Sequence, residues 1–448
     1  MSKYRYTLQN YHAIKEADII IDGITVLAGE NGSGKSTLSR WLYYVINGVA
    51  KFESILFQEY LNYVLNILGQ WRLVSRDIMR IMSPYKQISN NRFAFINDAE
   101  EKINQLLLTG EFEGDNIDKV KMIFLLTLDA FAEQLKLFLD SEIPAIRKNR
   151  ILNYLNIKYT TTNDSNIVVN NYRKNVVRQI NIVVKKNYEQ IEKRTKDDLF
   201  RLIMNQYKEY DLSPKELQLI EEGVELFDET HVSYIYNLTN AIYVDTPMSI
   251  TSNDNNNELW NRLSLLMYQN SDKEISFDTK KIIRRVSDII GGEIKLKDTL
   301  FSDELRYISL DKSIDIELDK TATGIKTFSY IQRLLQNGYL TNKTLLLIDE
   351  PEAHLHPQWI VEYARLLIYI HKYLGTKIMI ASHNPDMVAA IRSISEKENI
   401  LECTHFYIAK KDMRGQYSYK DLGKNIEEIF ESFNIALERI NLYGANNI

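Results

Sequence analysis

The feature that most constrains this chain is an octapeptide near its N-terminus, Gly29-Glu30-Asn31-Gly32-Ser33-Gly34-Lys35-Ser36. It fits the pattern G-x-x-x-x-G-K-[ST]. The apolar residues 24–28 before it predict a strand, and residues 36–46 after it predict a helix. Glycines let backbone N–H groups turn toward an anion, and the start of a helix adds free amides and a favourable dipole. The sequence therefore predicts a phosphate-binding loop.

Each residue type in this phosphate-binding loop has an expected role. Lys35 should reach the β- and γ-phosphates of a nucleotide, and Ser36 should bind Mg²⁺ through its hydroxyl. The nucleotide should contact Gly29, Glu30, Asn31, Gly32, Ser33, Gly34, Lys35, Ser36 and Thr37. The loop alone leaves kinases, GTPases and motor ATPases open. A GTPase would also need Asn-Lys-x-Asp, and the segment 342–345 (NKTL) lacks the aspartate.

Two apolar runs predict the centre of a parallel sheet. Leu345–Ile348 and Ile378–Ala381 show no alternation, which is typical of parallel strands buried on both faces. The residues between them contain a helical pattern over 359–373, long enough for a right-handed crossover. Ligands of such sheets bind beyond the carboxyl ends of the strands.

Polar residues follow both runs at that edge. Asp349 and Glu350 end the first strand, and His383 follows the second. We expect Asp349 to hold Mg²⁺ together with Ser36, and Glu350 to polarise the attacking water. His383 should sense the γ-phosphate. Lys35, Glu350 and His383 are therefore the expected catalytic residues.

His354 and His356 suggest a metal site as an alternative. The two histidines come just after Asp349 and Glu350, but no third ligand follows at typical zinc spacing. We therefore interpret the segment as a loop that packs against a partner subunit.

The middle of the chain differs from its ends. Few glycines and prolines occur there, and apolar residues recur every three or four positions, which predicts helices around 53–82, 117–140 and 171–210. The ends, 1–50 and 231–448, should form one α/β domain, and 51–230 a helical insertion. In the ends we expect a hairpin over 18–28, a second over 406–420, and a closing helix over 425–442.

A basic stretch lies inside the expected insertion. Between Tyr172 and Lys196 there are eight basic residues and two acidic ones, so the local charge is 8 − 2 = +6. Such a helix could follow a nucleic-acid backbone, and a solvated helix face is the alternative. The whole chain has a net charge of −5, so any nucleic-acid surface must be local. The longest apolar runs are far short of the roughly 20 residues that span a bilayer, and we expect a cytosolic protein.

Taken together, the segments 29–37, 349–357 and 382–385 resemble the ABC-type ATPase domain. More narrowly, they resemble the bacterial AAA-domain ATPases of the overcoming-lysogenization-defect and chromosome-maintenance branch, in which the strand-end DE is followed by P-E-x-H-L-H-P, as here. The segment 10–15 (NYHAIK) resembles that group's N-terminal N-F-R-S-F-K, with His12 in place of the arginine. The resemblance implies an α/β fold with a mixed sheet and helices on both faces, with ATP and Mg²⁺ as cofactors.

The ABC-type resemblance also implies a signature loop that caps the γ-phosphate of a second subunit. The usual L-S-G-G-Q is absent, and the best candidate is Thr323-Gly324, with Thr323 as helix N-cap and phosphate donor and Lys326 adding charge. The implied protein is an ATP-hydrolysing switch that dimerises, or forms a higher homo-oligomer, through an ATP sandwich, in DNA maintenance or phage defence. DNA is a candidate partner. The alternatives are a slow-turnover scaffold for a separately encoded effector nuclease, and a transporter ATPase subunit.

Overall fold

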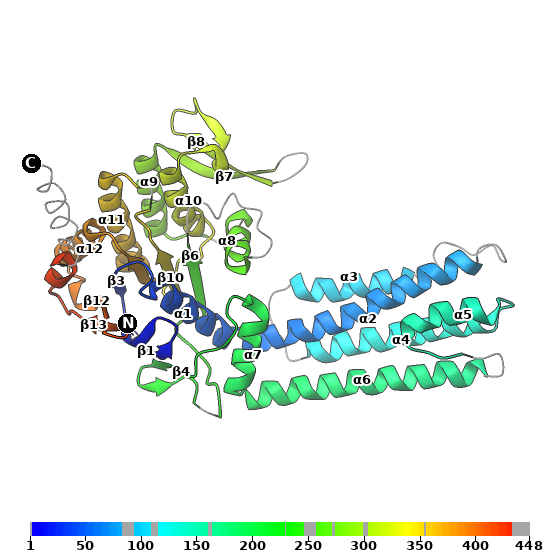
Figure 1. The fold of residues 1–448 in the computed structure, drawn as a ribbon. Coiled ribbons are helices and arrows are strands. Elements are labelled where there is room, and N and C mark those ends of the chain that lie inside the picture. The colour runs from blue at the N-terminus through cyan, green and yellow to red at the C-terminus, as the bar shows by residue number, and fades with distance from the viewer. Residues whose placement is uncertain are drawn as a thin grey trace, which may run out of the picture. The chain divides into compact units, whose positions relative to one another are not determined.

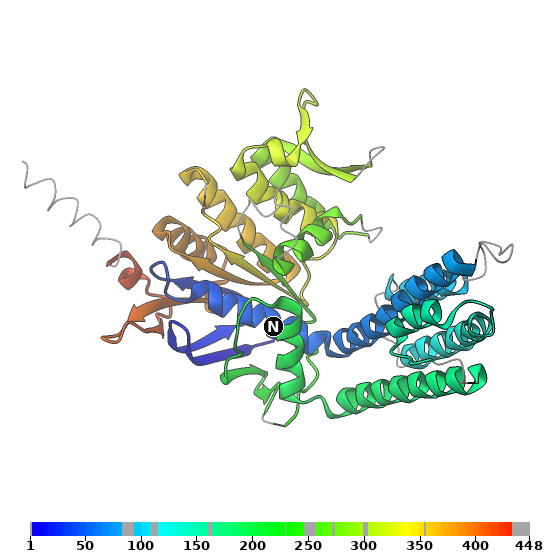
Figure 2. The same ribbon diagram turned by 45° about the vertical axis from the view of Figure 1, so that its right-hand side comes forward.

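The computed structural model describes residues 2–82, 94–108, 115–159, 164–228, 230–245, 257–270, 274–298, 303–353 and 355–431. The chain divides into two compact units (Figures 1 and 2). The first, here the ATPase unit, contains residues 1–50 and 195–448, and the second, the helical unit, is Lys51–Arg194.

The ATPase unit contains strands and helices from both sides of the helical unit. Its strands are β1 Tyr4–Tyr11, β2 Ile14–Ile21, β3 Ile24–Ala28, β4 Glu216–Glu221, β5 Val224–Glu225, β6 Asn240–Val244, β7 Gly292–Asp298, β8 Asp303–Ser309, β9 Asp315–Glu317, β10 Thr344–Asp349, β11 Lys377–Ser382, β12 Thr404–Lys411 and β13 Tyr417–Asp421. Its helices are α1 Lys35–Ala50, α7 Lys196–Tyr207, α8 Glu258–Tyr268, α9 Phe277–Ile290, α10 Thr323–Gln336, α11 Pro357–Leu374 and α12 Pro385–Lys397.

A ten-stranded mixed sheet forms the centre of the ATPase unit, in the order β5-β4-β1-β2-β13-β12-β3-β11-β10-β6. The five strands from β12 to β6 are parallel, and this confirms the prediction made for the apolar runs of β10 and β11. Leu346 and Ile348 belong to the core shared with α9–α12, whereas Met379 faces α1 at Ser39. Helices therefore cover both faces of the sheet (Figure 2), and the expected α/β fold class is confirmed. A second, three-stranded sheet, β7-β8-β9, was not expected.

The expected crossover and one of the expected hairpins are confirmed. β10 and β11 pair in parallel on either side of α11, and β12 pairs with β13 in antiparallel register around Gly415. The expected hairpin over 18–28 is wrong, because β12 and β13 lie between β2 and β3. β2 alternates and pairs with β1, whereas the fully buried β3 takes two parallel neighbours from the C-terminal half. Most of the expected closing helix lies outside the described residues.

Residues 195–230 belong to the ATPase unit, so the expected boundary at 230 is wrong. The single helix expected over 171–210 breaks where Arg194 has a left-handed φ of 42° and the Thr195 side chain accepts a bond from Asp198 N as the cap of α7. Beyond α7, β4 pairs with β1 and buries Leu217 and Leu219 in alternation. These residues therefore extend the sheet.

The helical unit consists of α2 Phe52–Met82, α3 Ala94–Leu108, α4 Asn116–Leu139, α5 Ala145–Leu152, the 3-10 turn Asn153–Leu155 and α6 Ser165–Lys193. Figure 1 shows these helices side by side along one direction. Trp71 stacks on Phe124 and Phe131, with ring centroids 5.1 and 5.0 Å apart, and its Nε1 donates to Tyr172 Oη at 2.7 Å. In the portion of the chain that the structure describes, none of the helices is both long and apolar enough to cross a membrane.

Candidate active site

The phosphate-binding loop connects β3 to α1. Gly32 and Gly34 have positive φ values of 78° and 92°. A Cβ on Gly34 would lie 2.7 Å from Ile14 Cγ1, so a larger residue would be both strained and crowded. Leu38 N donates to the Gly34 carbonyl at 3.0 Å, which starts the helix directly after the loop. The first N–H groups of α1 therefore face the loop without intrahelical acceptors.

Lys35 is the first residue of α1, and only 5 % of its surface is exposed. Its Nζ donates to the carbonyls of Gly29 and Glu30 at 2.9 and 3.0 Å. Burial lowers the pKa of Lys35, and the nearby carboxylates of Asp349 and Glu350 act against that shift. The buried ammonium is thus bonded to neutral carbonyls, and a phosphate group would supply the full negative charge that it lacks.

Asp349 ends β10 and is buried. Its Oδ2 accepts a bond from Tyr243 Oη at 3.0 Å, and its Oδ1 is buried without a hydrogen-bond partner among the described residues. Burial raises the pKa of Asp349, and the neighbouring hydroxyls of Ser36 and Tyr243 act in the opposite direction. An unpartnered carboxylate oxygen beside a serine hydroxyl is a hard oxygen donor set, so these residues fit Mg²⁺.

Glu350 follows with a left-handed φ of 46°. Its N–H donates to the Ala381 carbonyl at 2.8 Å, which holds the residue against β11. A non-glycine residue in this region costs about 1–3 kcal/mol, and such strain is concentrated at functional sites. The carboxylate is 43 % exposed, so a water molecule can reach it.

His383 joins the two carboxylates that follow β10. Its Nδ1 lies 3.3 Å from Glu350 Oε1 and 3.5 Å from Glu352 Oε1. The structure therefore brings the expected water-polarising residue and the expected sensor into contact.

Glu352 was not expected to have a role of its own. Its side chain is 3 % exposed, and Oε1 accepts bonds from Ser382 Oγ at 2.8 Å and His383 N at 3.0 Å. Burial raises the pKa of Glu352, while its bonds to Ser382 and His383 act against that shift. Its Oε2 is buried without a partner in the described structure. The only sequence signal was a third carboxylate two positions after Glu350.

A partly exposed ionic network that the sequence did not predict lies behind Asp349. Arg40 Nε donates to Tyr243 Oη at 3.3 Å, Arg40 also pairs with Glu209, and its second nitrogen lies 3.4 Å from Asp245. Tyr243 in turn donates a hydrogen bond to Asp349. The residues come from α1, β6 and the segment after α7, too far apart in sequence to be recognised as one cluster.

A hollow of about 620 Å³ opens at the turn between β1 and β2, lined by residues 9–12, 209–213, 215 and 216. His12 lies in this turn with a φ of 50°, and its ring is 5.7 Å from that of Tyr210. Tyr210 stacks on Trp41 at 5.6 Å, and its hydroxyl is close to Thr37 of the loop. Aromatic rings next to the phosphate loop suit the base of a nucleotide.

The structure corrects part of the expected signature loop. Ala322, not Thr323, is the N-cap of α10, and Thr323 is its first helical residue. Gly324 is buried, and a Cβ there would lie 2.7 Å from the Trp359 ring. Lys326 is buried as well. The role of Thr323 and Gly324 at a second subunit's phosphate stays a prediction.

Of the two histidines after Glu352, the structure describes only His356. His356 is the N-cap of α11, where its Nδ1 accepts from Gln358 N at 3.4 Å, and His354 lies outside the described residues. Among the described residues, no group of three or more His, Cys, Asp or Glu side chains is placed to hold a metal.

Comparison with known proteins gives several matches. The family model described as the AAA ATPase domain matches residues 5–388. The energy-coupling factor transporter ATP-binding protein EcfA2 of Clostridium perfringens is 27% identical over 165 residues, which are 34% of this chain and 50% of the relative. The chain thus spans about half the length of the curated relatives it matches.

Solved structures that resemble the chain include two Smc head domains. That of Pyrococcus furiosus, bound to the C-terminal domain of ScpA, is 12% identical with a TM-score of 0.34, and covers 98% of this chain and 100% of its own. That of Thermotoga maritima is 10% identical with a TM-score of 0.36, and covers 94% and 99%.

The family match covers well over half of the chain and includes the loop, the strand-end carboxylates and His383. It confirms the expected resemblance to AAA-domain ATPases. The chain belongs to the AAA ATPase domain family, and it is accordingly assigned as an ATPase.

Proposed function

We propose that this protein is an ATP-hydrolysing switch, in which two copies close on two ATP molecules and separate after hydrolysis. The observation that carries the proposal is a set of charged groups at one sheet edge that the chain itself leaves incompletely paired. Lys35 has only carbonyl partners, Asp349 has a free buried oxygen, and Glu350 is strained and open to water. These groups match the parts of a phosphoryl-transfer site.

In the proposed step, water attacks the γ-phosphorus of ATP and the bond from phosphorus to the β–γ bridging oxygen breaks. Glu350 accepts the proton of the water, and the products are ADP and inorganic phosphate. Lys35 neutralises charge on the β- and γ-phosphates. A Mg²⁺ held by Ser36 and Asp349 would supply further charge neutralisation. Glu352 holds His383 in place, so that loss of the γ-phosphate is felt at the loop after β11.

Thr323 of one copy would contact the γ-phosphate held by the other, since the start of a helix is an anion site. We place this switch in the cytoplasm, in DNA maintenance or phage defence, because the strand-end motif resembles that branch of ATPases. A scaffold that hydrolyses slowly and holds a separately encoded effector nuclease is the second candidate. The residues of the candidate ATP site all lie in the ATPase unit, so we expect the helical unit to bind a partner.

The test is Glu350→Gln, which keeps the phosphate and metal ligands but removes the base. The variant should bind ATP, lose turnover, and double its mass in light scattering with Mg-ATP, because trapped ATP favours the closed state. A further Thr323→Asp substitution in the Glu350→Gln protein should restore the monomer, because the new carboxylate would repel the γ-phosphate. Asp is well accepted at a helix start. Gly324→Asp is unsuitable, because it would clash with Trp359.

Glu402→Gln, at an exposed site, is the matched control and should change nothing. An unchanged mass of the Glu350→Gln protein with and without Mg-ATP would contradict the sandwich. Slow wild-type turnover that DNA does not stimulate would favour the scaffold over the switch.

A further inference from the structure

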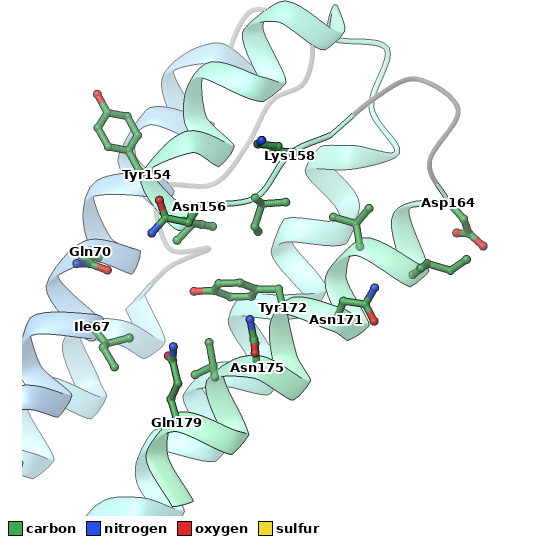
Figure 3. A pocket seen from close by; sticks show the side chains of 15 residues that line it. Ile67, Gln70, Tyr154, Asn156, Lys158, Asp164, Asn171, Tyr172, Asn175 and Gln179 are labelled. Carbon is green, nitrogen blue, oxygen red and sulfur yellow. The ribbon is translucent and has the colours of Figure 1, made fainter. Parts of the chain in front are cut away.

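A hollow of about 630 Å³ lies in the helical unit, among α2, the segment 154–158 and α6. Figure 3 shows the amides of Gln70, Asn156, Asn175 and Gln179 around the ring of Tyr172. This volume is within the range of sites that hold small organic groups. The ATP site is elsewhere, in the other unit, so the hollow has no part in hydrolysis.

The four amides have no hydrogen-bond partner in the described structure, so each offers a donor and an acceptor. Asparagine is a weak helix former, and Asn175 sits in the middle of α6. Asn187 on the same helix shows what a packing role looks like, because it is buried and its amide donates to the Leu56 carbonyl at 3.1 Å. Asn175 has no comparable internal contact. All four amides belong to exposed residues, so they can reach a ligand that enters the hollow.

The charges of the residues that line the hollow limit the class of ligand that it can bind. Lys158 and Asp164 are its charged lining residues, and their charges cancel. Neutral amides bind groups that carry donors and acceptors side by side, as a nucleobase edge does. Two aromatic rings, Tyr172 and the 62 % exposed Tyr154, also line the hollow and can stack on a base.

A basic row runs next to the amides along α6. Lys174, Arg178 and Lys185 line a shallow depression of their own. Lys174 is three residues from Asn171 and Arg178 three from Asn175, so the basic and amide rows are neighbours on the helix surface.

The structure separates this row from the rest of the basic stretch. Arg173 pairs with Asp129 at 2.6 Å, and the buried Arg194 pairs with Glu53 at 3.1 Å. Within the row, Lys185 lies 3.7 Å from Glu189, whereas Lys174 and Arg178 have no ion pair in the part of the chain that is described. They are therefore available to an external anion.

We propose that the helical unit binds single-stranded nucleic acid, with bases in the amide-lined hollow and phosphates on the basic row of α6. A single strand is required because its base edges are unpaired and can turn into a hollow, whereas those of a duplex cannot. Binding needs no nucleotide at the ATP site, so this inference stands apart from the proposed hydrolysis.

The experiment uses the full chain without ATP and fluorescein-labelled 20-mers of dA, dT, rA and rU, with a 20-base-pair duplex for comparison. Fluorescence anisotropy should show binding of single strands with a preference among bases. Asn175→Ala with Gln179→Ala should weaken binding of the preferred base about tenfold and remove the preference. Lys174→Gln with Arg178→Gln should weaken all strands alike, and reduce the slope of log K against log salt by about 1.4.

Matched controls are available on α3, where Asn104→Ala with Gln105→Ala and Lys102→Gln should change nothing. Lys35→Ala should also bind strands normally. Photocrosslinking of a bromouridine strand to wild type should label peptides with Tyr154 or Tyr172, which keeps the test valid if a variant misfolds. The proposal would be overturned if wild type and both α6 variants bound single strands equally, or if the duplex were bound as tightly as a single strand. It would also be overturned if the protein bound extended peptides and no nucleic acid.

Discussion

The two units treat buried charge in opposite ways. In the helical unit, the ammonium of Lys148 donates to the carbonyls of Leu139 and Ser141, both at 2.6 Å, and so closes the end of α4. In the ATPase unit, Asp349 and Glu352 each keep a buried carboxylate oxygen without a partner among the described residues. The first arrangement is complete within the chain.

The second arrangement is incomplete, and it surrounds the phosphate loop. Unpaired buried charge costs stability, so a protein retains it where a ligand or metal completes it. The comparison therefore teaches that buried carboxylate oxygens left without a partner, not buried charge as such, mark the candidate active site. Four predictions test it.

The largest effect should come from the aromatic core of the helical unit. Trp71→Ala removes the stack with Phe124 and Phe131 and should lower the free energy of unfolding by about 3–5 kcal/mol, measured by circular dichroism in urea. Trp71→Phe keeps most of the stack and should cost far less. ATP turnover of the folded fraction should stay near the wild-type value. A large fall in that turnover would contradict the independence of the two units.

Lys35→Ala should abolish most catalysis. The phosphate charge loses its main side-chain partner, so turnover should fall about 10²–10³-fold, with weaker ATP binding. Phosphate release and binding of a fluorescent ATP analogue measure the two effects. Lys343→Ala, at the opposite end of β10, is the control and should behave as wild type. Unchanged turnover in Lys35→Ala would remove the loop from the mechanism.

Lys148→Met should destabilise the helical unit. The apolar side chain has a similar size, but the carbonyls at the end of α4 lose two charge-assisted bonds, for a cost of about 1.5–3 kcal/mol. Thermal unfolding would measure it. A neutral or stabilising outcome would mean that this charge is no better satisfied than those at the ATP site.

Asp349→Asn should have the opposite effect and slightly stabilise the nucleotide-free protein. Burial raises the pKa of Asp349 in the folded state, so its ionisation costs stability at neutral pH. The penalty shrinks as pH falls through the folded pKa and disappears below the unfolded value of about 3.9. The melting temperature of the variant should exceed that of wild type at pH 8 and approach it toward pH 5. A lower melting temperature at pH 8 would contradict the assignment.

The sequence predicted the parts of the site that lie on local motifs. Asp349, Glu350 and His383 follow buried apolar strands, and the edge of a parallel sheet brings such ends together. The parts it missed depend on distant segments. Arg40, Glu209 and Asp245 meet only because α1, β6 and the chain after α7 pack together.

The errors in the fold have the same cause, with two exceptions. The false hairpin at Asp22-Gly23 followed a correct local turn signal, and strands from the far end of the chain overrode it. The break before α7 could have been recognised, because Thr195 with Asp198 three residues later is a helix-start pattern. The alternation of β4 over Glu216–Glu221 was also readable as a strand.

The position of β12 and β13 between β2 and β3 has a consequence for biosynthesis. The strand that leads into the phosphate loop lacks one of its two neighbours until residues 404–411 leave the ribosome, and Tyr419, which donates to the Ser33 carbonyl at 3.2 Å, emerges later still. At roughly 5–20 residues per second, the N-terminal strands wait tens of seconds for their partners. A nascent chain can therefore complete its helical unit well before it can bind ATP. Nucleotide binding by a nascent chain would thus indicate that translation has passed β13.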